Sequence, residues 1–201
     1  MITGAILLAA GSGVRFGGKK QDLIFHGSPL WRYAYNILNK FIDSTHLVAV
    51  GQDILGGETR TLSVSIGLAN LPDDTERVII AEAARPFVLP EQVDKLIKDN
   101  HDSASFVKPL VNTVIFRDGS YIDREHLYEL LTPQAFSFPK LRYAYSHRSS
   151  DNFTDETRIM YEVLGIKPFF IETGQNLFKL TYQEDIAVLE SLYQHYKERI
   201  S

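Results

Sequence analysis

Short apolar runs alternate with stretches of helical periodicity along most of this chain. The apolar runs predict buried strands, and they fall at residues 2–10, 46–51, 77–83, 105–112 and 167–172. Apolar residues spaced three and four positions apart predict helices, and they fall at residues 29–41, 59–71, 90–101, 138–147, 155–164 and 183–199. Strands that alternate with helices predict an α/β fold with a doubly wound, Rossmann-like and mostly parallel sheet.

Local signals refine these boundaries. Ser28-Pro29 is a favourable helix start, because proline fits the first turn of a helix. The order Thr181 to Glu184 predicts a capping box at the start of the last helix. Asp118-Gly119 lies near the centre of residues 114–123 and predicts a β-hairpin, which we expect to protrude as a short arm at about residues 112–125.

The composition fits one globular domain over residues 1–201, with 44% hydrophobic side chains to form its core. The formal net charge is −4 and the basic residues are dispersed, which argues against nucleic acid or an anionic membrane as a partner. The absence of cysteine excludes disulfides, thiolate zinc sites and a cysteine nucleophile, and the six histidines show no metal-ligand spacing. No apolar stretch approaches the ~20 residues of a membrane span, so we expect a cytoplasmic protein.

The first predicted strand ends in a glycine-rich loop, which is the most informative feature of the sequence. Glycine lets backbone N–H groups approach an anion closely, so such a loop can hold phosphates. Arg15 and Lys20 follow within reach of whatever the loop binds. The loop lacks the Gly-Lys-Ser/Thr ending of the ATPase P-loop and the glycine spacing of dinucleotide-binding folds. A strand, a small-residue loop and then Arg and Lys-Gln resemble the signature of sugar nucleotidyltransferases.

Further segments extend this resemblance over nearly the whole chain. They are residues 56–64, 83–86, 112–113, 122–124, 132–136, 154–156, and 179–181 with 184–185. In this order they resemble the motifs of the 2-C-methyl-D-erythritol 4-phosphate cytidylyltransferase family, which acts in non-mevalonate isoprenoid biosynthesis. The resemblance implies a nucleotidyltransferase fold and an enzyme that joins a polyol phosphate to CTP and releases pyrophosphate.

The resemblance also implies roles for individual residues. The catalytic cations would be Arg15, Lys20 and Lys179. The residues that bind the nucleotide would be Ala9, Ala10, Gly11, Ser12, Gly13, Gly57, Ser63 and Ala83. Those that bind the polyol phosphate would be Arg85, Thr113, Arg124, Thr154 and Asp155. Mg²⁺, or another divalent cation, would be held by triphosphate oxygens and Glu82. The arm implies a homodimer in which Arg124 reaches the neighbouring subunit's site.

Some of these residues also have a structural explanation. Lys179 alternates with Phe178 and Leu180, as on the exposed face of a strand. Arg124 lies between two acidic residues, a pattern typical of a solvated turn. Residues 154–156 are typical of a helix N-cap, in which the acidic side chains favour the helix dipole. These explanations do not exclude contact with a substrate.

The sequence departs from the family pattern next to the predicted site. Ala81-Glu82 stands where the family has His-Asp, Asn112 replaces an aspartate, and Leu177 replaces an asparagine. The nucleotide loop and the arm are also shorter. These departures leave two alternatives open: a cytidylyltransferase for ribitol phosphate or another polyol phosphate, and a non-catalytic paralogue that binds nucleotide. The intact cationic set favours an active enzyme.

Overall fold

A six-stranded sheet forms the centre of the computed structural model, which describes residues 1–200 apart from the side chain of Gln175. Its strands stand in the order β4 (Leu47–Val50), β1 (Thr3–Leu8), β5 (Arg77–Glu82), β7 (Tyr128–Ser137), β6 (Ser103–Pro109) and β8 (Phe169–Glu172). Neighbouring strands are parallel except around β7, which runs antiparallel to both β5 and β6. The prediction of a mostly parallel sheet is confirmed.

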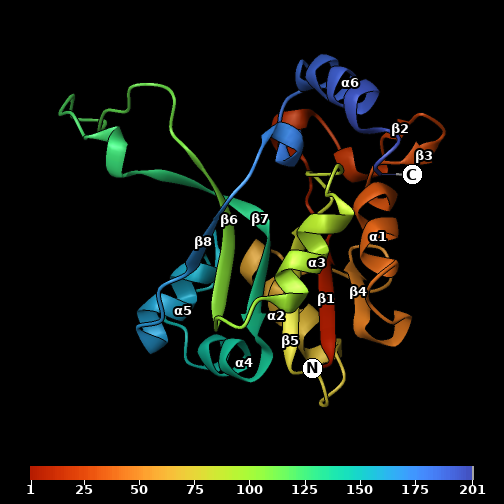
Figure 1. Cartoon of the computed structure of the whole chain (residues 1–201), viewed down its shortest axis with the longest axis vertical. Coiled ribbons are helices and arrows are strands. Elements are labelled where there is room, and N and C mark those ends of the chain that lie inside the picture. The colour runs from red at the N-terminus through yellow and green to blue at the C-terminus, as the bar shows by residue number, and fades with distance from the viewer. Residues whose placement is uncertain (201) are drawn as a thin grey trace.

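Helices cover both faces of this sheet (Figure 1). One face carries α1 (Trp31–Asn39) and α3 (Pro90–Lys98), and the other carries α2 (Arg60–Asn70), α4 (Phe138–Ser146) and α5 (Glu156–Leu164). Successive side chains of a strand point to opposite faces, so β1 contributes to both cores: Ala5 and Leu7 pack in one, and Ile6 packs in the other. This is the predicted doubly wound arrangement.

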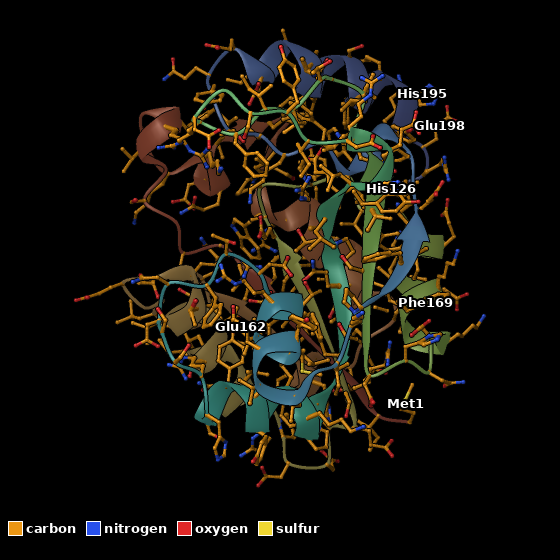
Figure 2. All side chains as sticks on the ribbon, turned by 90° about the vertical axis from the view of Figure 1, so that its left-hand side faces the viewer. Met1, His126, Glu162, Phe169, His195 and Glu198 are labelled. Atoms are coloured by element: carbon orange, nitrogen blue, oxygen red, sulfur yellow. The ribbon has the colours of Figure 1, made fainter. Side chains whose placement is uncertain are left out.

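The carboxyl ends of the parallel strands lie beneath α6 (Asp185–Tyr196), at the top of Figure 1. A third apolar cluster, which includes Phe25, Phe87 and Leu189, packs α6 against a two-stranded hairpin of β2 (Ile24–Phe25) and β3 (Ser28–Pro29). In Figure 2, His195 of α6 and Met1 lie at opposite ends of the molecule.

Short 3-10 helices are η1 (Val14–Phe16), η2 (Lys20–Asp22), η3 (Ser44–His46), η4 (Arg124–His126) and η5 (Gln175–Leu177). Within residues 1–200, no helix has the length and apolar character needed to cross a membrane.

Strand β7 was not predicted. Its sequence contains Pro133 and the fully buried polar residue Gln134, which interrupt the apolar run expected of a central strand. The strand forms because β5 and β6 pair with it on its two sides. The predicted start of the first helix is also wrong: Ser28-Pro29 pairs with β2, and α1 begins only at Trp31.

The predicted capping box at the start of α6 does not form. Asp185 takes its place, because one oxygen of its carboxylate accepts hydrogen bonds from the backbone N–H groups of Thr181 (2.7 Å) and Tyr182 (2.8 Å). Glu184 makes no side-chain capping bond. The carboxylate that satisfies these donors therefore comes from the first helical residue and not from Glu184.

Residues 110–127, which we call the arm segment, leave the sheet between β6 and β7 and project away from its body (Figure 1). Across the described chain, strand pairing in this segment is limited to one isolated bridge, between Ile115 and Tyr121. The predicted hairpin over residues 114–123 is thus reduced to a bridge around the Asp118-Gly119 turn. Val111 and Tyr121 are 79% and 80% exposed, so this segment has little packing against the sheet.

Candidate active site

A cavity of about 490 Å³ opens at the carboxyl ends of β1 and β5. Its walls come from segments far apart in the sequence: the loop after β1, the start of α2, the end of β5 and the segment before α6. Ligands of doubly wound sheets bind at this edge. The residues predicted to bind the nucleotide that line the cavity are Ala9, Ala10, Gly11, Ser12, Gly57, Ser63 and Ala83.

The glycine-rich loop is folded back on itself at Gly13. This residue adopts a left-handed conformation with φ 66°, and its carbonyl accepts hydrogen bonds from the N–H groups of Phe16, Gly17 and Gly18. A Cβ atom at this position would lie 1.7 Å from the Gly18 oxygen, so only glycine fits. Gly13 itself does not line the cavity; it shapes the loop whose earlier residues do.

The opposite wall is the turn that leads into α2. Thr59 caps this helix, since its hydroxyl accepts a hydrogen bond from the N–H of Leu62 at 3.1 Å. The hydroxyl of Ser63 accepts a bond from the N–H of Gly57 at 3.1 Å and holds the turn against the helix. A Cβ at Gly57 would come within 2.5 Å of the Leu62 Cβ, so the turn depends on glycine for this close approach.

All of the predicted catalytic cations, Arg15, Lys20 and Lys179, line the cavity. Lys20 donates from Nζ to the carbonyl of Leu180 at 2.7 Å, which ties the loop after β1 to a segment 160 residues away. Burial, followed by the repulsion of the Lys179 ammonium, lowers the pKa of Lys20 below its ordinary value. Arg15 lies over the ring of Tyr182, 5.9 Å from its centroid.

Glu82 lies between two cations at the end of β5. Its Oε1 accepts a hydrogen bond from Nε of Arg60 at 3.0 Å, and its Oε2 lies 2.5 Å from Nζ of Lys179. Burial alone would raise the pKa of this carboxyl, but the Arg60 guanidinium and the Lys179 ammonium outweigh it and lower the pKa to about 2. Glu82 is therefore ionised at neutral pH.

The donor set of the cavity fits a divalent cation only in combination with a phosphate ligand. Residues 1–200 contain no cluster of three or more acidic or histidine side chains that could hold a metal. Glu82 presents an ionised carboxylate to the cavity, with both oxygens already in contact with cations, and Glu58 lies at the exposed rim. One carboxylate with phosphate oxygens is a common environment for Mg²⁺.

The residues predicted to bind the second substrate do not line the cavity. Arg85 is 7% exposed and donates from Nη1 to the carbonyl of Leu177, so it holds the segment that carries Lys179. Asp155 caps α5, accepting from the N–H of Thr157 at 2.8 Å, and its other oxygen accepts from Nε2 of Gln134 at 2.7 Å. Arg85 and Asp155 therefore both have structural roles. Their contact with substrate stays a prediction.

The remaining substrate-side residues are exposed. Thr154 lies just before the α5 cap, and Thr113 and Arg124 lie on the arm segment. Arg124 donates from Nη1 to the carbonyl of Val111 within that segment. Neither arm residue reaches the cavity of its own chain.

Sequence reasoning assigned no role to several other residues of the cavity wall. These are Leu8, Gln21, Glu58, Thr59, Arg60 and Ala84. Gln21 is 4% exposed and donates to the carbonyl of Gly11 at 2.9 Å, which braces the loop. In the sequence, the position of Gln21 directly after Lys20 was the feature that could have indicated its place in the loop. Arg60 lies in residues 56–64, which resemble a family motif, but its two carboxylate partners lie far away in the sequence, so its contacts could not be predicted.

A Rossmann-like sheet with a glycine-rich loop and converging cations at its carboxyl edge defines the class of the protein: it is a nucleotidyltransferase. The family model for 2-C-methyl-D-erythritol 4-phosphate cytidylyltransferase (IspD) matches residues 3–195. The chain therefore belongs to the IspD family.

Individual relatives agree with this assignment. The chain is 33% identical to the 2-C-methyl-D-erythritol 4-phosphate cytidylyltransferase of Caldicellulosiruptor bescii, over 96% of this chain and 98% of that protein. It is 31% identical to the enzyme of the same name from Thermotoga neapolitana, over 98% and 99% of the two chains.

Among solved structures, the bifunctional IspDF of Campylobacter jejuni matches with a TM-score of 0.81 at 29% identity, over 93% of this chain and 54% of that one. The 4-diphosphocytidyl-2C-methyl-D-erythritol synthase of Anaerococcus prevotii matches with a TM-score of 0.79 at 24% identity, over 96% and 98% of the chains. The second likeness shows the fold alone.

Proposed function

We propose that this chain transfers the cytidylyl group of CTP to 2-C-methyl-D-erythritol 4-phosphate, releasing pyrophosphate, and acts as a cytoplasmic homodimer in isoprenoid biosynthesis. The observation that carries the proposal is the convergence of Arg15, Lys20 and Lys179 on one cavity beside the glycine-rich loop. Membership of the IspD family selects the substrates.

The reaction needs little covalent chemistry from the protein. An oxygen of the acceptor phosphate attacks the α-phosphorus of CTP, and the bond to pyrophosphate breaks on the opposite side. Catalysis then consists of positioning and of neutralising the charge that develops on the phosphate oxygens. The cavity is suited to both, because its cations come from separate segments and surround one space.

Each side chain has a distinct part in this proposal. Arg15 and Lys20 stabilise the triphosphate and the charge of the departing pyrophosphate. Lys179, which pairs with Glu82, bridges the α-phosphate and the incoming phosphate. Gly57 and Ser63 lie on the wall assigned to the cytidine. The loop residues Ala10, Gly11 and Ser12 form the wall assigned to the phosphates.

A magnesium ion would be held mainly by triphosphate oxygens, with Glu82 supplying at most one protein carboxylate, and it would neutralise phosphate charge. The expected consequence is loss of turnover on chelation with EDTA and recovery on adding Mg²⁺ in excess. Turnover that is unaffected by EDTA would remove the ion from the proposal.

The second substrate requires more than the cavity of one chain. Arg85, Thr154 and Asp155 lie on this chain, and Thr113 and Arg124 lie on its arm segment, away from its own cavity. A partner's arm segment would bring Arg124 to the site, and the planar guanidinium suits a phosphate. Mixed dimers of Arg124→Ala and Lys20→Ala chains should then recover part of the activity. Demonstrated heterodimers without recovery would place Arg124 outside the partner's site.

Pyrophosphate release tests the proposed function directly. The purified protein receives CTP and Mg²⁺ with methylerythritol phosphate, with ribitol phosphate, or with no acceptor. Release that depends on methylerythritol phosphate supports the proposal, and release only with ribitol phosphate overturns the choice of acceptor. A folded protein that binds CTP but is silent with both acceptors is a non-catalytic paralogue.

A further inference from the structure

A continuous chain of charged contacts runs from the cavity into the interior. Nζ of Lys179 lies 2.5 Å from Oε2 of Glu82, and Oε1 of Glu82 accepts from Nε of Arg60 at 3.0 Å. The two terminal nitrogens of Arg60 donate to the two carboxylate oxygens of Glu156, at 2.5 and 2.9 Å. The hydroxyl of Tyr145 donates to Glu156 at 3.0 Å and ends the chain.

The outer end of this chain of contacts is more exposed than its inner end. The side chain of Lys179 is 37% exposed at the cavity, those of Glu82 and Arg60 are 11% and 23% exposed, and that of Glu156 is 1% exposed. Acidic and basic groups alternate, so Glu82 and Arg60 each have an oppositely charged partner on either side. The bidentate pair of Arg60 and Glu156 fixes the guanidinium plane, because an arginine fork and a carboxylate match in geometry.

The outer end of this chain of contacts, at Lys179, lacks such rigidity. Lys179 lies between η5 and α6, in a stretch without helix or strand, and its ammonium sits on a flexible stem. The neighbouring backbone is fixed, since the N–H of Leu180 donates to the carbonyl of Ala84 at 2.9 Å and Arg85 donates to the carbonyl of Leu177. What orients the ammonium itself, among the contacts of the described residues, is the Oε2 atom of Glu82.

We propose that Arg60 is a positioning residue for the transfer reaction: anchored by Glu156, it holds one oxygen of Glu82 and thereby directs the other oxygen, and Lys179 with it, toward the cavity. This inference rests on the proposed function, which gives Lys179 its part in catalysis. Arg60 acts here through Glu82 and not through contact with the nucleotide. Lysine in its place would keep the charge but could not contact both carboxylates with one rigid plane.

Steady-state kinetics of Arg60→Met separate positioning from binding. We expect kcat to fall by about 100-fold, as misplacement of a catalytic group by about 1 Å can cause, while the KM for CTP changes by less than about threefold. Arg60→Lys should recover little of the loss. A rise in KM with an unchanged kcat would mean that Arg60 binds the nucleotide, and it would overturn the inference.

A matched control is Arg77→Met at the other end of β5. Arg77 is also buried and ion-paired, with Asp99 at 3.1 Å, but it lies far from the cavity wall. We expect its kcat to stay within about twofold of the wild type even where its thermal stability falls as far as that of Arg60→Met. Equal losses of kcat in the two variants would reduce Arg60 to a purely structural residue.

A double-mutant cycle with Glu82→Gln tests the route of the effect. If Arg60 acts through Glu82, adding Arg60→Met to Glu82→Gln should change kcat by no more than about twofold, because the second substitution removes an effect already lost. A full further loss of about 100-fold on this background would show independent action and overturn the inference.

Trace acetylation of lysines, measured by mass spectrometry, supplies a test without turnover. Modification of Lys179 should rise by about threefold in Arg60→Met, toward its value in Glu82→Gln, as expected on loosening a partly exposed ion pair. Lys140, paired with Asp102 at 2.6 Å on the surface, is the internal control. This result stands even if the wild type transfers no cytidylyl group, so the two failures are distinguishable.

The same labelling remains decisive if Arg60→Met fails to fold because Glu156 is left buried without a cationic partner. The double variant Arg60→Met/Glu156→Gln removes that charge and should show the same rise at Lys179. Unchanged labelling of Lys179 in the folded variant would overturn the inference.

Discussion

The two ends of β5 each carry a buried charge, and they use it differently. At the amino end, Arg77 is 3% exposed and donates to the carbonyls of Leu96 (2.8 Å) and His101 (3.0 Å) and to the carboxylate of Asp99 (3.1 Å). All these partners belong to the protein, and together they tie the end of α3 to the sheet. The guanidinium of Arg77 therefore serves to hold the fold together.

At the carboxyl end, Glu82 has partners of two kinds. Arg60 lies on the cavity wall and links Glu82 to the buried Glu156, whereas Lys179 is 37% exposed and faces the open cavity. At the amino end of β5, the ion pair of Arg77 and Asp99 is enclosed by the protein, and we call this the closed end. At the carboxyl end, the ion pair of Glu82 and Lys179 faces the cavity, and we call this the open end. In a parallel sheet the carboxyl edge is where loops separate and leave space, so charge placed there remains available to a ligand.

Removing a cation from the open end should have the largest effect. Lys20→Ala and Lys179→Ala are each expected to lower kcat by about 10²- to 10³-fold, since each loses a fixed positive charge beside the reacting phosphates. Pyrophosphate release at saturating CTP measures the loss, and circular dichroism checks the fold. A near-normal rate in either variant would contradict the assignment of that lysine.

Removing the cation from the closed end should affect stability instead. Arg77→Met leaves Asp99 beside the interior without its guanidinium and is expected to lower the free energy of unfolding by about 3 kcal/mol. Urea denaturation measures this change, with kcat as the control. A loss of kcat without a loss of stability would show that Arg77 also acts on catalysis, so that the two ends of β5 do not have separate roles.

The pH dependence of stability reports on Glu82. Its pKa is about 2 in the folded protein against an ordinary value of 4.5, so the unfolded chain takes up the proton first as pH falls. The stability that Glu82 contributes is therefore complete above pH 4.5 and is lost toward pH 2.

Glu82→Gln removes this titration. The difference in unfolding free energy between wild type and variant should shrink by about 2–3 kcal/mol as pH falls through this window. Urea unfolding at several pH values, in both proteins, measures it. Parallel pH curves for the two proteins would contradict the depressed pKa.

The smallest effect is expected at a surface pair near the closed end. Lys140 lies 2.6 Å from Asp102, as close a contact as that of Lys179 with Glu82, but both side chains are well exposed. Lys140→Ala should lower the free energy of unfolding by less than about 1 kcal/mol and leave kcat unchanged. A larger effect on either quantity would mean that distance, and not burial or location, decides the value of a lysine–carboxylate pair here.

Most of the fold could be predicted because its elements carry local periodicity. Strand β4 is apolar throughout, β1 and β5 have apolar interiors, and α1 and α3 have one apolar face. Strand β7 could not be found this way, because Gln134 is fully buried and its amide reaches Ser105 and Asp155 on other elements. Such a residue looks like part of a loop until its distant partners are known.

The candidate site divides in the same way. The glycine-rich loop and its cations are recognisable because they form motifs within a few residues. The pair of Arg60 and Glu156 joins residues 96 positions apart, and nothing near either residue in the sequence identifies its partner. The same holds for the donation of Lys20 to the carbonyl of Leu180. Local motifs thus predict the loop and the cations of the site, and tertiary contacts decide which other residues join them and how they are held.

The arm segment begins and ends at one point of the sheet. Pro109 and Tyr128 are directly paired across β6 and β7, so the chain leaves the sheet and returns to it at the same rung of the ladder. Shortening or lengthening the stretch between them changes neither strand register nor cores, and the entropy of closing a loop grows only slowly with its length. The segment is thus an insertion point, where the length of the appendage, and with it the reach of Arg124, can change while the walls of the cavity stay as they are.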